Sequence, residues 1–485
     1  MTRQLRNTFA LTLAILTLAA ATAQRGDEIL ANLRKDDWKA AYALAQDVAK
    51  QPSAPARDKG LAAMAAIRAG DDKLAARLTD GGTKSAHGWQ KLAHAAVVQL
   101  QNNVREAERL AKEALSEPEA VNDARAFLFG IYQSEGEFAT AAPYGKAILE
   151  AEPKGYPFDE LLPQLKGLVA VYPTIPQRPK VEPAEGMNVR IPLKQVRPYI
   201  TVEAMANEKP LVLALDTGGS VHPSLSPTKA KELGIEALGT SAAFGFGGLE
   251  TVEIGIIEKL QIGDVTIGKQ PAAMIGMLDM LTKFMGIGGV LDTRWMLDYV
   301  STVDFDRKTL TLSDVSVYKG KPGEVLTQTD GSKQIAVPFS LIGDAKIVLP
   351  VKLNDWETWA LLDTGAPINM YSFEWMQETL KEEDYKIGPS LAGGVGTSAE
   401  KGKSIVSTKP LTLTVGGHKI TIARPVGQDS LDKQVSHGLG FRMGALLGLE
   451  LFKDAQQFTI DGPARMLYIV YKAPGASSVP TKAED

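Results

Sequence analysis

Two stretches decide the fold of this 485-residue chain, LVLALDTGGS at 211–220 and WALLDTGAPI at 359–368. Each is a run of apolar residues that leads into Asp-Thr-Gly. An apolar run of this kind predicts a β-strand buried in a core, and the glycine permits a tight turn directly after it. The sequence therefore predicts two carboxylates, Asp216 and Asp363, each delivered at the end of a buried strand.

Each of these strands is the second strand of a predicted hairpin. In the first copy a strand opens at Val202 and a turn follows at Ala206–Lys209; in the second a strand opens at Val351 and a turn follows at Asn354–Glu357. Short alternating runs separated by turn residues are typical of antiparallel sheets. The matched hairpins indicate that one β-rich unit is written twice in the chain.

The two copies also match after their Asp-Thr-Gly motifs. A glycine-rich stretch follows each motif, FGFGGLE at 244–250 and AGGVGTSAEKG at 392–402. The copies then close alike, on GGVLDTRWMLDYV from residue 288 and GALLGLELFKDAQ from residue 444. The second half of the β-rich region is thus interpreted as a copy of the first.

A duplicated unit of this kind can bring the two aspartates together as an acid–base pair. Two copies can pack about a pseudo-twofold axis, so that Asp216 and Asp363 face each other across a water molecule. Carboxylates that close cannot both ionise, so the pair would hold one proton, with one member acting as base and the other as acid. Such a pair activates water for attack on an amide carbonyl.

With these residues in view, the region from about 188 to 472 resembles the aspartic proteases, and specifically bacterial relatives of the retropepsins. The resemblance implies an all-β, bilobal fold whose catalytic site forms within one chain. It implies that Asp216 and Asp363 are the catalytic dyad and that the Thr217 and Thr364 hydroxyls lock the two active-site loops together. Further loop support is implied for Gly218, Gly365 and Gly448, and flaps over the substrate for Phe246, Gly247, Gly248, Val395 and Gly396.

The first copy departs from the family pattern in two places. Leu446-Leu447-Gly448 matches the family's closing element, but in the first copy Asp292 stands where glycine is expected. Gly219 follows the first Asp-Thr-Gly, where the family usually has Ser, Thr or Ala. Asp292 is expected to crowd the loop or to add a third carboxylate near the dyad. Both departures favour the alternative function, a catalytically weak or inactive scaffold that binds extended peptides.

The residues from about 27 to 172 predict helices, because apolar residues recur there at helical spacing. Four segments echo one another about 34 residues apart, the tetratricopeptide period: Trp38-x-x-Ala41, Asp72-x-x-Ala75, Val104-x-x-Ala107 and Phe138-x-x-Ala141. The stretch resembles a degenerate tetratricopeptide array, with a plain helical bundle as the alternative. Helix stacks of this type usually bind partners, so a protein partner is expected on this domain.

The first residues and the composition indicate the compartment and exclude several kinds of site. Arg3 and Arg6 precede an apolar stretch that closes on small residues, which predicts a secretory signal peptide cut before Gln24 and a periplasmic or extracellular protein. An uncleaved membrane anchor is the alternative, and no membrane span is expected after cleavage. The chain has no cysteine, its histidines lack metal-ligand spacing, and it is slightly acidic, so we expect no metal, no cofactor and no nucleic-acid partner.

Taken together, these patterns predict a multidomain chain: an all-α, tetratricopeptide-like domain followed by an all-β, bilobal, retropepsin-like one. The expected boundaries are a signal peptide at 1–23, the helical domain at 24–172, a proline-rich linker at 173–187, a first lobe at 188–318, an inter-lobe linker at 319–334, a second lobe at 335–473 and a tail at 474–485. The predicted function is that of an exported aspartic endopeptidase acting on a polypeptide.

Overall fold

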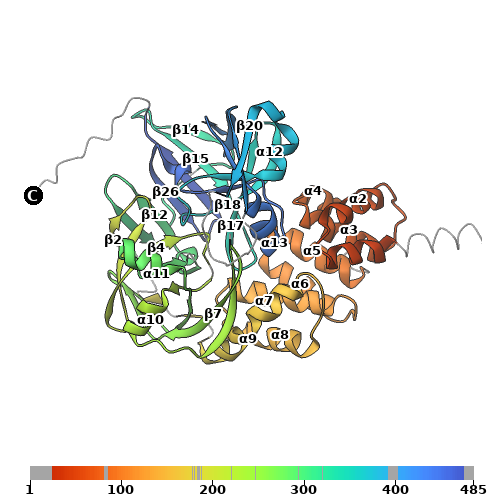
Figure 1. Cartoon of the computed structure of the whole chain (residues 1–485), viewed down its shortest axis with the longest axis horizontal. Coiled ribbons are helices and arrows are strands. Elements are labelled where there is room, and N and C mark those ends of the chain that lie inside the picture. Colours follow the sequence, from red (N-terminus) through yellow and green to blue (C-terminus); the bar gives the residue numbers. More distant parts are fainter. Residues whose placement is uncertain are drawn as a thin grey trace, which may run out of the picture. The chain divides into compact units, whose positions relative to one another are not determined.

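The computed structural model describes residues 25–473, apart from 81–85, 177, 180, 183–185, 187, 220, 246, 293, 319 and 391–401. Helices occupy the N-terminal part and strands most of the remainder (Figure 1). The chain divides into two compact units. The first takes in Met1–Leu128, Ala147–Leu162 and Gly440–Arg442, and the second takes in Phe129–Lys146, Pro163–Leu439 and Met443–Asp485. The predicted signal peptide and tail lie outside the described residues.

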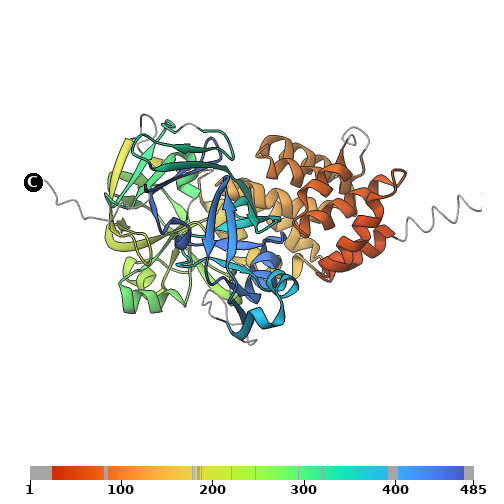
Figure 2. The ribbon, with the colours of Figure 1, turned by 90° about the horizontal axis from the view of Figure 1, so that it is seen from above.

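Helical hairpins form the N-terminal part, and the second helix of each begins where the sequence repeats begin. These second helices are α2 (Trp38–Ala49), α4 (Asp72–Thr79), α6 (Val104–Ala114) and α8 (Phe138–Ala151). The first helices are residues 25–34, α3 (Ala56–Arg68), α5 (Gly88–Leu100) and α7 (Val121–Ser134). Within the first compact unit, α3 packs against α2, α4 and α5, which lie side by side in Figures 1 and 2.

The same local devices recur at each of these hairpins. The turn before each second helix contains a residue with positive φ, namely Asp36, Gly70, Asn102 and Gly136. The side chains of Asp37, Asp71 and Asn103 then cap the next helix by accepting from a backbone N–H in its first turn. The alanines singled out in the repeats are fully buried, as close helix packing requires: Ala41, Ala75, Ala107 and Ala141.

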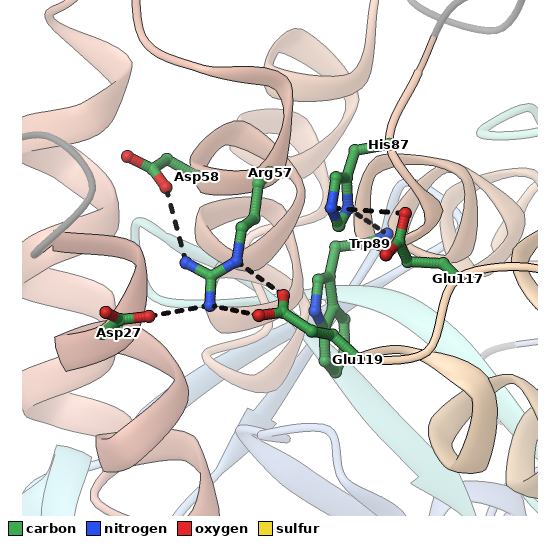
Figure 3. A network of polar contacts seen from close by, with 7 residues as sticks. All are labelled: Asp27, Arg57, Asp58, His87, Trp89, Glu117 and Glu119. Atoms are coloured by element: carbon green, nitrogen blue, oxygen red, sulfur yellow. Dashed lines mark hydrogen bonds and ion pairs between the residues drawn. The ribbon is translucent and has the colours of Figure 1, made fainter. Parts of the chain in front are cut away.

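A charged network connects the first helix of the first unit, through Arg57, to the turn between α6 and α7 (Figure 3). Arg57 pairs with Asp27 at 2.8 Å and with Glu119 at 2.6 Å. Its guanidinium also lies 3.9 Å from Asp58, a buried carboxylate whose pKa is raised by burial in spite of Arg57. The network connects segments that are far apart in sequence, which is a structural role.

The strands of the first half of the β-rich region form one continuous set of pairings. In order of pairing they run β6-β7-β10-β5-β11-β4-β3-β8-β9. Their bounds are β3 (Thr201–Ala206), β4 (Lys209–Asp216), β5 (Ser224–Leu225), β6 (Gly239–Gly245), β7 (Gly248–Ile257), β8 (Leu260–Ile262), β9 (Val265–Ile267), β10 (Gln270–Met274) and β11 (Gly289–Asp292).

The strands of the second half pair in the corresponding order, β20-β21-β24-β19-β25-β18-β17-β22-β23, and β16 (Ser340–Ile342) adds to β17. Parallel and antiparallel pairs fall at the same places in both orders. The bounds are β17 (Lys346–Leu353), β18 (Trp356–Leu362), β19 (Met370–Ser372), β20 (Tyr385–Pro389), β21 (Lys403–Ser407), β22 (Leu411–Val415), β23 (His418–Ile422), β24 (Val426–Gln428) and β25 (Ala445–Leu447).

The two hairpins predicted from the sequence are confirmed. Strands β3 and β4 pair antiparallel, as do β17 and β18. A short capped helix follows the next strand in each half, α10 (Pro227–Leu233) after β5 and α12 (Phe373–Thr379) after β19. With α11 (Leu278–Met285) and α13 (Ser436–Leu439), these short helices make the region mixed rather than purely β. Helix α11 contacts β11, and α12 contacts β19, β21 and β24.

A further sheet joins the two halves at their closing strands. Its order is β2-β13-β12-β26-β27-β15-β14, so that β12 of the first half pairs with β26 of the second. At this seam the hydroxyls of Thr302 and Thr459 are 2.8 Å apart. The strands are β2 (Asn188–Gln195), β12 (Val300–Asp304), β13 (Thr309–Ser313), β14 (Val325–Thr327), β15 (Lys333–Pro338), β26 (Ala455–Asp461) and β27 (Met466–Tyr471).

Parts of the last helices belong to the same compact unit as these strands. The Ser241 hydroxyl on β6 donates to the carbonyl of Gln164 on α9 (Phe158–Val171) at 2.6 Å. The Arg294 guanidinium donates to the carbonyl of Glu135 at 2.7 Å. Strand β1 (Val181–Glu182), in the stretch expected to be a linker, pairs with β9. Among the described helices, none is long and apolar enough to cross a membrane.

Candidate active site

The two Asp-Thr-Gly turns follow equivalent strands and hold their aspartates in the same way. Asp216 is the last residue of β4, and Asp363 directly follows β18. The amide of Gly218 donates to Oδ1 of Asp216 at 2.9 Å, and the amide of Gly365 donates to Oδ1 of Asp363 at 2.8 Å. Each carboxylate is therefore oriented by the backbone of its own turn.

The threonines bond across from one turn to the other. The amide of Thr217 donates to Oγ1 of Thr364 at 3.1 Å, and the amide of Thr364 donates to Oγ1 of Thr217 at 2.9 Å. Each hydroxyl also donates, at 2.8 Å, to a carbonyl on the opposite strand, that of Leu362 for Thr217 and that of Leu215 for Thr364. Both side chains are buried, so these four bonds satisfy groups that water cannot reach.

The glycines of the two motifs bring the carboxylates together. A β-carbon at Gly218 would lie 2.4 Å from Cγ of Asp363, and one at Gly365 would lie 2.6 Å from Cγ of Asp216. These distances are far below van der Waals contact, so only glycine fits at either position. Each carboxylate consequently lies against the glycine of the opposite turn.

The environment of the pair favours a shared proton. Asp216 is half-buried, whereas Asp363 is buried. Burial, the charge of Asp216 and a hydrogen bond between the two carboxyl groups raise the pKa of Asp363 well above its usual range, and the amide of Gly365 and the Lys346 charge oppose the rise. At neutral pH the arrangement can therefore hold one proton and one negative charge, as the sequence analysis expects of such a pair.

Asp292 is a third carboxylate beside this pair. It is the last residue of β11 and lies opposite Asp216 in the parallel pairing of β11 with β4. Its Oδ1 accepts from the amide of Arg294 at 2.8 Å. Burial raises the pKa of Asp292 to about 7, although the Arg294 amide and guanidinium oppose the rise.

Gly448 follows the equivalent strand of the second half, β25, and has no room for a side chain. A β-carbon there would lie 2.4 Å from the carbonyl oxygen of Ala366 and 2.5 Å from that of Ile368. The amide of Gly448 donates to Oδ1 of Asn369 at 2.9 Å. The loop after the second motif thus packs tightly on Gly448, whereas the first half accommodates Asp292 at the corresponding place.

Lys346 is a charged residue near the dyad that the sequence analysis missed. Its ammonium donates to the carbonyl of Gly219, directly after the first motif, and pairs with Asp344 at 3.1 Å. The contact joins residues 127 positions apart, which no local pattern reveals. The one available signal is a lysine at the start of strand β17, directly before the apolar residues Ile347, Val348 and Leu349.

His222 is buried in the loop after the first motif. Burial lowers its pKa to about 4, against the opposing charge of Asp344. The imidazole is therefore neutral at neutral pH. Within the described part of the chain, no group of three or more His, Asp or Glu side chains is arranged to hold a metal ion.

Of the residues expected to form flaps, the structure describes two. Gly247 lies in the turn between β6 and β7, and Gly248 begins β7 with a φ of 92°. Gly248 pairs with Gly245, so this segment is the tip of a hairpin. Phe246, Val395 and Gly396 lie outside the described residues.

Comparison with known proteins finds similarity among the solved structures. No family model and no curated protein matches the sequence. The chain is similar to a retropepsin-like aspartic protease from Rickettsia conorii, at 17% identity and a TM-score of 0.20, over 28% of this chain and 92% of that chain. At that TM-score the similarity does not bear on function, so the candidate site rests on its own geometry.

Proposed function

We propose that this protein is an exported aspartic endopeptidase that hydrolyses peptide bonds with water activated by Asp216 and Asp363. The observation that carries the proposal is their reciprocal packing, in which each carboxylate lies against the glycine of the opposite turn. Packing the carboxylates of Asp216 and Asp363 against each other, away from bulk water, costs free energy, because one charge must be desolvated or neutralised. A surface that only bound peptides would not need this arrangement.

The proposed reaction divides the acid and base roles by environment. Asp363, whose pKa is raised, holds the shared proton, and the half-buried Asp216 is the ionised base. Asp216 removes a proton from water as the water oxygen adds to the amide carbonyl carbon, and Asp363 gives its proton to the carbonyl oxygen. Asp216 then protonates the departing nitrogen while Asp363 takes a proton from the gem-diol. The C–N bond breaks, and both carboxyl groups return to their starting states.

The alternative function is a scaffold that binds extended peptides without cutting them. Asp292 favours it, because this buried carboxyl group opposite Asp216 adds a third ionisable group to the site. In that case the helical hairpins, which we propose to be tetratricopeptide-like, would recruit a protein partner. Their matched turns, caps and buried alanines support this part of the proposal.

The test is incubation of the purified protein with a denatured protein mixture, followed by mass spectrometry of the newly formed ends. We expect new ends with the wild type and none with Asp216→Asn or Asp363→Asn. Asp355→Asn is the matched control, because Asp355 is exposed in the turn between β17 and β18. Tight peptide binding without new ends in the wild type would favour the scaffold. Export is tested separately, by asking whether the protein recovered from cells begins at Gln24.

A further inference from the structure

The loop after the first motif is held by a side chain from the other half of the chain. The ammonium of Lys346, on β17, donates to the carbonyl of Gly219. Asp344 accepts from the same ammonium at 3.2 Å, and the Lys346 side chain is only 12% exposed. A buried lysine is costly unless it is paired in this way, so the contact is a built feature of the site rather than a surface ion pair.

Gly219 in turn lies against Asp216. Its amide donates to the carbonyl of Asp216 at 3.3 Å, which closes the turn, and a β-carbon at Gly219 would lie 3.4 Å from Oδ2 of Asp216. A group that fixes the Gly219 carbonyl therefore also fixes the turn on which the Asp216 carboxylate stands.

In the second half, the equivalent carbonyl is held by a backbone amide. Ala366 takes the place of Gly219, and its amide donates to the carbonyl of Asp363 at 3.2 Å. The carbonyl of Ala366 accepts from the backbone amide of Leu449 at 2.8 Å. The equivalent carbonyl thus accepts from a neutral amide in the second half and from the Lys346 ammonium in the first. Lys346 therefore places a positive charge on the Asp216 side of the dyad.

Several ionisable groups share the field of that charge. Asp344 pairs with Lys346 directly, while Asp363, Asp292 and His222 interact with it electrostatically. The charge lowers the pKa of Asp363 and of Asp292, in both cases against the larger effect of burial. Without Lys346, burial and the neighbouring carboxylate would raise the pKa of Asp363 further.

We propose that Lys346 is a positioning residue of the dyad, which anchors the Asp216 turn through Gly219 and favours the singly ionised state of the pair by its charge. This inference rests on the proposed peptidase function. The two loops thus differ in how they are held. A charged side chain of the second half binds the Gly219 carbonyl, whereas a backbone amide of the same half binds the Ala366 carbonyl.

The test compares pH–rate profiles of Lys346→Met, Lys346→Gln and Lys346→Arg with that of the wild type, on one peptide substrate. Lys352→Met is the control, since Lys352 lies on the same strand with an exposed side chain. In Lys346→Met we expect kcat to fall about tenfold with little change in KM, and both limbs of the profile to move up by about half to one pH unit. Lys346→Arg is expected to retain the profile. Lys346→Gln keeps a donor for Gly219 without the charge, so its limbs should move while kcat falls less.

An unchanged profile in both Lys346→Met and Lys346→Gln would overturn the inference while leaving the peptidase proposal intact. A second measurement, NMR titration of the 13Cγ-labelled aspartates in the full chain, does not depend on turnover. Signals assigned to Asp216 and Asp363 through their Asn variants should titrate at higher pH in Lys346→Gln than in the wild type. If the wild type cuts nothing, this titration still decides the inference: a shift supports it and identical curves contradict it.

Discussion

The carboxylate of Asp363 lies against Gly218, so that a β-carbon on that glycine would come 2.4 Å from Cγ of the aspartate. The relationship is reciprocal, since Gly365 stands in the same way against Asp216. Each motif therefore supplies the carboxylate of its own half and the surface on which the other carboxylate rests. Neither half has a complete site without the other.

This packing predicts that Gly218→Ala and Gly365→Ala each abolish peptide hydrolysis, because the new methyl group must push the opposite carboxylate out of place. We also expect lower stability, measured as a lower midpoint of urea unfolding. Gly130→Ala is the control, as the nearest atom to a β-carbon at this helical glycine is 3.8 Å away. Full activity in either motif variant would show that the carboxylates do not need this arrangement.

The crossed threonine bonds predict that Thr217→Val and Thr364→Val each destabilise the protein by about 1–3 kcal/mol. Valine fills the same space but leaves a buried amide on the opposite turn without its acceptor. The free energy of unfolding from urea titrations measures the loss, and Thr311→Val on strand β13, half-buried, serves as the control. Equal stability of the motif variants and the wild type would mean that water replaces the lost bonds.

Asp292 predicts a stability that falls as the pH rises. Its folded-state pKa, about 7, lies above the ordinary value of 3.8, so the folded protein prefers the neutral carboxyl. The contribution of Asp292 to the free energy of unfolding is therefore fully present below the unfolded-state pKa. It is lost as the pH rises through the folded-state pKa, because the buried carboxyl must then ionise. Asp292→Asn should therefore match the wild type near pH 4 and exceed it above pH 7 by about 2–4 kcal/mol.

Urea unfolding of both proteins across that pH range checks the prediction. The Asn oxygen can still accept from the Arg294 amide, so the local hydrogen bond is kept. The control is Asp264→Asn, in the exposed turn between β8 and β9. In this variant the free energy of unfolding should change between pH 4 and pH 7 by the same amount as in the wild type. Parallel stability curves for Asp292→Asn and the wild type would contradict the burial argument.

The residues after the two motifs predict activity at mildly acidic to near-neutral pH. Neither Gly219 nor Ala366 has a hydroxyl that could donate to an ionised aspartate and so lower the pKa of the dyad. Gly219→Ser should move the acidic limb of the pH–rate profile to lower pH, because a β-carbon there would lie 3.4 Å from Oδ2 of Asp216. Ala366→Ser is expected to act likewise. The hypothesis fails if the wild type works only in strong acid or if the serines leave the limb unmoved.

Local signals in the sequence were sufficient for the elements that carry the site. Alternating runs and turn residues located the two hairpins, which the structure forms as β3–β4 and β17–β18. The helical repeats located the starts of α2, α4, α6 and α8, because capping side chains and buried alanines recur at a regular spacing. Such features depend on neighbouring residues and can be read without the rest of the chain.

Contacts between distant residues could not be predicted in the same way. Asp292 was marked by its departure from a pattern, but its place opposite Asp216 depends on the register of two strands 76 residues apart in the pairing. Lys346 carried no motif, and its bond to Gly219 exists only because the two halves of the chain meet. Which side chains meet where the two halves join depends on the tertiary structure, so a short segment of sequence cannot reveal these contacts.

The seam between β12 and β26 has a consequence for the order in which this protein matures. The sheet that joins the two halves is completed by β27, which ends at Tyr471 and pairs with both β15 and β26. Pairings between residues this distant form slowly, and they cannot form before β27 has been synthesised. A nascent first half therefore carries one aspartate and no partner for it. The proposed peptidase activity needs both aspartates, so we expect it to be absent until the second half has folded onto the first.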